Sequence, residues 1–117
     1  MKDVLDYFGK LLIEEVRDKT IRGFDMRVAG KMRDMSSLKL FEEIQQLDGA
    51  SKIVEKIIPQ IVDLSIHNLL CMIEEDPNVV LQIENENLSE ISDGLAGELY
   101  TEDGWIQRFS KQRYEET

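Results

Sequence analysis

The 117-residue chain contains a single cysteine and a single histidine, and this scarcity excludes several kinds of site. Cys71 alone provides neither an internal disulfide nor a cysteine-cluster zinc site. It lies in an apolar run, residues 69–73, where we expect a buried small hydrophobic side chain. The chain also lacks a phosphate-binding loop, a nucleophile elbow, a catalytic Cys/His pair and a dinucleotide fingerprint. These absences argue against an enzyme.

Basic side chains are missing from a long part of the second half. Residues 1–58 contain 11 basic and 11 acidic side chains, whereas residues 59–117 contain 3 and 13, which accounts for the net charge of -10. No lysine or arginine lies between Lys56 and Arg108. Because a field of one sign repels phosphate groups, we expect no binding to nucleic acid or to anionic membranes, and favour a basic protein partner. A purely solubilising role for the charge is the alternative.

Unbroken apolar runs are also short, and none approaches the roughly 20 residues that cross a bilayer. Residues 1–6 include acids where a secretory signal needs a basic segment, so we expect a cytoplasmic protein. The hydrophobic fraction of 42% is too high for a disordered acidic tail. The length suits one domain with one core.

Apolar residues recur at helical spacing through most of the chain, which predicts a mainly α fold. We expect one domain over residues 1–117, a helical bundle around a long central helix, with a frayed tail from about residue 112. Helices are predicted over 3–19 and 24–35, from a Ser36 or Ser37 cap to Asp48, and over 51–75. The last is apolar nearly all round beyond Pro59, so other helices should surround it, and Pro59 should kink or split it.

The β-branched segment 79–83 predicts at most one short strand. No second strand is evident, so this strand would pair with a second copy, a partner or an irregular segment. Asn87 and Glu90 have the spacing of a capping box, and Thr101 is placed to cap a last helix whose Trp105 faces inward. A homodimer through residues 79–83 is therefore one expectation.

Three candidate ligands share one face of the predicted central helix, because Asp63, His67 and Glu74 are separated by four and seven residues. They could form a metal site or an acid-oriented general base. The alternative function is a small metal-dependent hydrolase that uses either these residues or Asp93, Glu98 and Asp103. The structural alternative is an ordinary ion pair or a hydrogen-bonded histidine. We favour the structural alternative and expect no metal and no cofactor.

The helix dipole disfavours the acids at 74–76, the predicted end of the central helix. We expect a basic side chain of the same chain to offset them, from Arg27, Lys31 or Arg33, with a basic partner as the second alternative.

The most distinctive stretch, residues 92–105, places carboxylates beside three glycines and two aromatic residues. Such a combination is typical of a binding face, for which we select Glu98, Tyr100, Glu102, Asp103 and Trp105. The alternative is two capped turns in which Tyr100 and Trp105 close the core. No residue is selected as catalytic.

Residues 91–106, with Val16-Arg17-Asp18 and residues 67–70, resemble a group of small uncharacterised bacterial proteins over most of the chain. No activity, cofactor or site follows from that resemblance. In size, acidity and helix content the chain is also similar to bacterial toxin-immunity proteins as a class. The sequence therefore predicts a non-catalytic acidic protein that binds a basic protein, as an immunity-type inhibitor or a regulatory adaptor does.

Overall fold

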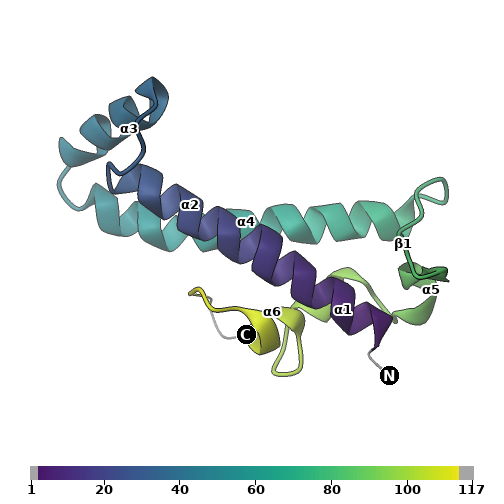
Figure 1. Ribbon diagram of the computed structural model, residues 1–117. Helices are drawn as coiled ribbons and strands as arrows, with labels where there is room; N and C mark the ends of the chain where they lie inside the picture. Colours follow the sequence, from purple (N-terminus) through teal and green to yellow (C-terminus); the bar gives the residue numbers. More distant parts are fainter. Residues whose placement is uncertain (1–2, 114–117) are drawn as a thin grey trace.

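The computed structural model describes residues 3–113 and is mainly α-helical, as the sequence predicts (Figure 1). The chain begins with a continuous helical rod made of α1 (Val4–Leu11), the π-helical stretch η1 (Leu12–Arg17) and α2 (Asp18–Val28). Two further helices, α3 (Met35–Gln45) and the long α4 (Ala50–Glu75), follow. The remaining elements are short: β1 (Gln82–Ile83), β2 (Glu86–Asn87), α5 (Leu88–Ile91), the 3-10 turn η2 (Ala96–Leu99) and α6 (Trp105–Phe109).

The first helical rod is longer than predicted, because Gly23 does not end it. A Cβ atom at Gly23 would meet nothing within 4 Å, and the helix continues to Val28. The rod ends before Gly30, whose φ of 78° is a left-handed conformation that glycine adopts readily. The predicted helix over 24–35 is therefore wrong: its first part belongs to α2 and its last residue begins α3.

The start of α3 is set by Asp34 and not by the predicted serine caps. The Asp34 carboxylate accepts a hydrogen bond from the backbone N–H of Ser37 at 3.1 Å and from the Ser37 hydroxyl at 2.8 Å. An aspartate in this position satisfies backbone donors that a helix start leaves free. Accepting these bonds lowers the pKa of Asp34, with the Ser37 hydroxyl as the main cause.

The π-helical stretch η1 rotates the buried face of the rod. A π turn contains more residues than an α turn, so the residues beyond it shift around the axis. Val16 is at helical spacing from Leu5, Phe8 and Leu12 and would face inward in an unbroken α-helix, but it is 47% exposed, while the neighbouring Arg17 is fully buried. Helical periodicity cannot reveal such a shift, because periodicity assumes the α-helical repeat throughout.

Two hydrophobic clusters fill the interior of an elongated molecule measuring 50 × 29 × 25 Å. The larger one joins α1 and η1 to the second half of α4 and to the C-terminal segments, with Trp105 buried in it. The smaller one joins α2, α3 and the first half of α4 around Ile21 and Ile58. Val62, midway along α4, packs against both clusters. Helix α4 is therefore central to both clusters, as predicted.

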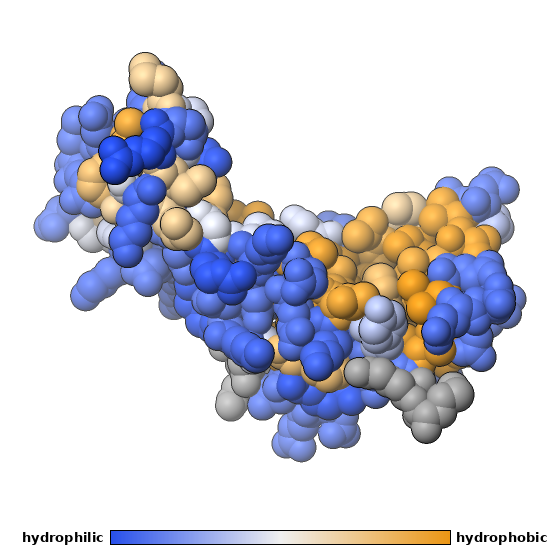
Figure 2. All heavy atoms as spheres, in the orientation of Figure 1, coloured by the Kyte–Doolittle hydropathy of each residue, from blue (hydrophilic) through white to orange (hydrophobic). Residues whose placement is uncertain are grey.

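The prediction that other helices surround α4 is wrong. Only Ile58, Pro59, Ile66 and Leu70 of its residues are buried, and one side carries exposed aliphatic side chains. Figure 2 shows apolar surface gathered over the part of α4 that the rod leaves uncovered. Pro59 lies within one helix of 26 residues, so it does not split the helix.

By length and composition alone, α4 is also apolar enough to cross a membrane. In its most apolar stretch, 22% is buried inside the protein. Unbroken apolar runs do not reveal this property, because Asp63 and His67 interrupt the apolar part of α4. Both of these polar side chains have partners within the fold, as described below.

The segment after α4 forms a tight hairpin, so the short strand finds its partner within the chain. Gln82 pairs with Asn87 and Ile83 pairs with Glu86. The two residues between them, Glu84 and Asn85, have φ values of 51° and 68°, as a two-residue hairpin loop of type I′ requires. The strand is shorter than the predicted 79–83. Its pairing removes the reason to expect a dimer through these residues.

The C-terminal segment is held against the body of the protein. Arg113 makes a bidentate ion pair with Asp25, in which Nη1 and Nη2 donate to the two carboxylate oxygens at 2.7 and 2.8 Å. Its Nε also donates to the backbone carbonyl of Glu55 at 2.9 Å. The predicted frayed tail therefore does not include Arg113, and its remainder, residues 114–117, lies outside the described residues. Helix α6 begins after Gly104 and not at Thr101, whose φ is 76°.

Candidate functional site

The three candidate ligands on α4 do not converge on one point. Asp63 faces the rod, where its Oδ1 accepts a 2.6 Å hydrogen bond from Nε of the buried Arg17. Glu74 accepts a 2.6 Å hydrogen bond from the backbone N–H of Leu95. Among residues 3–113 no group of three His, Cys, Asp or Glu side chains is arranged to hold a metal ion. The geometry thus gives these carboxylates structural partners.

The Leu95 contact also corrects the prediction about the acidic end of α4. The basic residues proposed for this role belong to the other end of the molecule; they are Arg27, Lys31 and Arg33. Lys31 lines a surface hollow there together with Ser51, near the start of α4. A backbone N–H, and not a basic side chain, is therefore the partner of Glu74.

Arg17 is the centre of a buried ionic cluster that the sequence analysis did not identify. Its guanidinium contacts Asp63, donates to Asp18 at 3.0 Å and to the Ser110 hydroxyl at 2.9 Å, and donates to the Arg113 carbonyl at 2.9 Å. Asp18 in turn accepts from the backbone N–H of Lys111 at 2.6 Å. The cluster joins the rod, α4 and the C-terminal segment. Its role is to hold these three parts together, since every donor and acceptor named here has a partner inside the fold.

His67 lies between a phenol and a thiol. The Tyr100 hydroxyl is 3.1 Å from His67 Nδ1, and Cys71 Sγ is 3.5 Å from His67 Nε2. Cys71 is half-buried and not fully buried as expected. Burial is the main cause that raises the pKa of Tyr100 above its ordinary value of 10.0, and the charges of Asp63 and Cys71 raise it further.

The raised pKa of Tyr100 predicts a measurable dependence on pH. The folded protein favours the neutral phenol, so this contribution to stability is complete below about pH 10 and is lost as the pH rises through the raised pKa. In a spectrophotometric titration of tyrosinate, the Tyr100→Phe variant should lack the last ionisation step. The Tyr7→Phe variant should retain that step, and the prediction fails if the two titrations are the same.

The predicted binding face divides into buried and exposed parts. Trp105 is fully buried against Phe8, with the two rings at 5.9 Å in an edge-to-face arrangement. Tyr100 is half-buried and faces His67. Trp105 therefore belongs to the core, as the alternative interpretation of residues 92–105 expected, and is not available to a partner.

The acidic members of that face remain accessible. Glu102 and Asp103 are exposed in the loop before α6, and Glu98 is half-buried and accepts a 2.7 Å hydrogen bond from the Ser92 hydroxyl. Residues 74–103 contain ten acidic side chains and no basic one. The ion pairs among residues 3–113 involve Asp6, Asp18, Asp25 and Asp63, so none of these ten carboxylates belongs to one.

We call this region, residues 74–103, the acidic segment. It follows the end of α4 through the hairpin and α5 to the loop before α6, along one end and the lower edge of the molecule in Figure 1. Two aliphatic side chains within it, Val80 and Ile91, are 57% and 44% exposed. The acidic segment therefore combines carboxylates that form no ion pair among the described residues with exposed apolar side chains.

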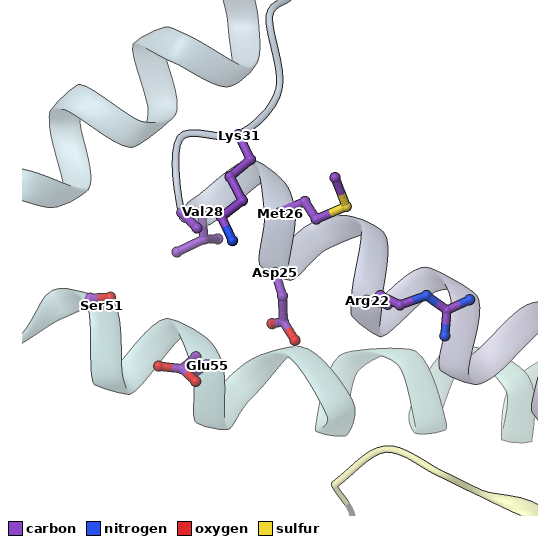
Figure 3. Close-up of a pocket in the computed structure, with 8 residues that line it drawn as sticks. Arg22, Asp25, Met26, Val28, Lys31, Ser51 and Glu55 are labelled. Carbon is purple, nitrogen blue, oxygen red and sulfur yellow. The ribbon is translucent and has the colours of Figure 1, made fainter.

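A shallow hollow of about 340 Å³ lies between α2 and the first part of α4 (Figure 3). Its walls include Arg22 and Lys31 as well as Asp25 and Glu55, so its charges are mixed. The Asp25 carboxylate is already paired with Arg113. The hollow therefore offers no single charge for a ligand and is a weaker candidate than the acidic segment.

Comparisons with known proteins add no assignment. No protein-family model matches the chain, and no curated protein or solved structure gives a significant match. The resemblance to small bacterial proteins thus stays a prediction.

Arg17 and Asp18 are the functional-site residues that the sequence pattern did not predict. An arginine next to an aspartate within an apolar helical pattern is nevertheless a usable signal for a buried ion pair.

Proposed function

We propose that the protein binds a basic partner protein through its acidic segment, without catalysis, as an immunity-type inhibitor or a regulatory adaptor in the bacterial cytoplasm. The observation that supports this function most directly is the run of ten carboxylates over residues 74–103, none of which makes an ion pair with another described residue. A metal-dependent hydrolase has less support, because Asp63 and Glu74 have separate structural partners.

The mechanism begins with electrostatic attraction at long range. A surface of one sign raises the rate at which an oppositely charged partner arrives, by roughly 10- to 1,000-fold at low ionic strength. Short-range contacts then decide how long the complex lasts. Val80 and Ile91 provide apolar contacts within the acidic segment, and Glu98, Glu102 and Asp103 provide carboxylates for lysine and arginine side chains. The same charge repels nucleic acid.

The test is a pull-down from the native host with the full chain, washed at low and at high salt. We expect a basic protein that is retained at low salt and released at high salt. With that protein in hand, the double variant Glu102→Lys and Asp103→Lys should lower the association rate constant at low salt by about tenfold, with less change in the dissociation rate.

A matched control is available on α3, where Glu42 and Glu43 are also adjacent and exposed. Replacing both with lysine changes the net charge by the same amount at a site outside the acidic segment. Association of this control should be close to that of the unmodified protein. Equal effects of the two double variants would show that only total charge matters, and would contradict the proposed site.

A further inference from the structure

An exposed apolar strip runs along α4 and is unrelated to the acidic segment. Its apolar members are 42–60% exposed and recur at intervals of three to five residues, which places them on the broad side of the helix that faces away from the core. They are Ile53, Ile57, Ile61, Leu64, Leu69 and Met72, and we call them the α4 strip.

The size of the α4 strip is within the range of the largest apolar patch on a monomer. From Ile53 to Met72 the helix rises about 29 Å, and with a helix width of about 10 Å the strip covers about 300 Å². The largest apolar patch on a typical monomer is about 300–600 Å² and is often an interaction site. Within residues 3–113, α4 contacts η1, α2, α3 and η2 with its other sides, so none of these elements covers the strip.

The order of residues along the strip is close to its own reverse. Positions 53 and 72, 57 and 68, and 61 and 64 are each symmetric about a point between residues 62 and 63. Five of these six positions are apolar, and the sixth is the exposed Asn68. A second α4 in the opposite direction would therefore place apolar side chains against apolar side chains at both ends and at the centre of the strip, whereas Ile57 would meet Asn68 and Leu69 would meet Lys56. An isologous two-fold interface needs this kind of self-complementarity.

Charge distinguishes the two possible directions of such a pair. Lys52 and Lys56 are exposed near the start of α4, while Glu75 and Asp76 are exposed at its end. An antiparallel pair places the basic start of each α4 beside the acidic end of the other. A parallel pair brings together two acidic segments of ten carboxylates each, which like-charge repulsion disfavours.

We propose that the α4 strip is the interface of an antiparallel homodimer, with a second copy of this chain as its occupant. A standard interface buries about 800 Å² on each partner, so a strip of this size with its charged flanks forms a small interface. We expect a dissociation constant of about 1–100 µM. The acidic segments then lie at opposite ends of the dimer, where their residues beyond Asp76 stay free for other contacts.

Sedimentation equilibrium of the full chain from about 1 to 300 µM tests the dimer. The mass should rise from 13.6 kDa to twice that value over this range. The Ile61→Glu variant should stay monomeric throughout, because it places a charge at the centre of the interface. The matched control is Leu47→Glu, at a side chain 66% exposed outside the strip, and it should dimerise like the unmodified chain.

Cysteine cross-linking tests the direction. In a Cys71→Ser background, the Ile53→Cys and Met72→Cys variants should form little disulfide alone and much disulfide when mixed. Self-linking of each variant alone would instead indicate a parallel pair and overturn the antiparallel proposal. Cys71 is half-buried and contacts His67, and serine is close to cysteine in size, so this replacement changes the surface of α4 little.

A chain that stays at 13.6 kDa at every concentration would overturn the dimer. Flotation with neutral phosphatidylcholine vesicles would then show whether a lipid surface covers the strip in its place. Circular dichroism of each variant confirms that the helices are intact. Failure of the dimer would leave the proposed function of the acidic segment unaffected, because the two surfaces share no residue in their tests.

Discussion

The Arg17→Ala variant is expected to lose about 3–5 kcal/mol of unfolding free energy, because it leaves buried carboxylates without their counter-charge. The Arg17 side chain is fully buried and contacts Asp18 and Asp63. Its removal also frees the C-terminal segment, which Arg17 holds through the Arg113 carbonyl. Urea denaturation followed by circular dichroism measures this loss.

The matched control is another arginine that makes an ion pair at the surface. Arg108 contacts Asp6 at 2.6 Å, but the two side chains are 38% and 34% exposed. The Arg108 guanidinium is the main cause that lowers the pKa of Asp6. Exposed pairs contribute about 0–1 kcal/mol, so Arg108→Ala should change stability little. Similar losses in the two variants would refute the central role of the Arg17 cluster.

The second large effect is expected at Trp105, whose replacement by alanine should cost about 3–5 kcal/mol. Trp105 packs against Phe8 and against Gly9, where a Cβ atom would collide with the indole ring. The Gly9→Val variant should accordingly destabilise the protein by about 1–3 kcal/mol through overpacking. The Met35→Ala control removes a side chain that is 85% exposed and should have an effect below about 0.5 kcal/mol.

The Trp105 experiment also separates the two interpretations of residues 92–105. A binding role would leave the folded state as stable as before and weaken only the complex with the partner. A core role destabilises the isolated protein. Thermal unfolding of Trp105→Ala without any partner therefore decides between them. An unchanged melting temperature would support the binding role of Trp105.

Much of the local structure could be predicted from the sequence. The Asn87 cap is one example, since its side chain accepts a 3.0 Å hydrogen bond from the Ser89 N–H. The inward-facing Trp105 and Ile106 are another. These features depend on residues close together in the chain, so their spacing contains the information needed to predict them.

Turns and helix ends were predicted less well. Two residues with positive φ, Glu84 and Asn85, close a hairpin that lacks the usual glycine, so the second strand was not recognised. Gly23 lies between the helices predicted over 3–19 and 24–35, although in the structure it is within the rod. A single glycine in a helix costs only about 1 kcal/mol, which tertiary packing readily offsets.

In the candidate site, too, local sequence predicts some features and distant segments decide the others. The accessibility of Glu102 and Asp103 agrees with their charge, because charged side chains are seldom buried without a partner. Asp63 and Glu74 share a helix face in the sequence, but their partners, Arg17 and Leu95, come from segments 46 and 21 residues away. Spacing along one helix cannot distinguish a metal site from two separate structural contacts.

The sequence by itself determined the helical class, the single long apolar helix and the concentration of negative charge in the second half, because each follows from composition or from local spacing. Only the tertiary structure decided that η1 turns Arg17 inward and that one side of α4 stays open. Helix α4 is 26 residues long, or about 39 Å, while the elements packed against it leave one side bare. Which side of an apolar helix is covered depends on where distant segments fold back, and that information does not lie within the helix.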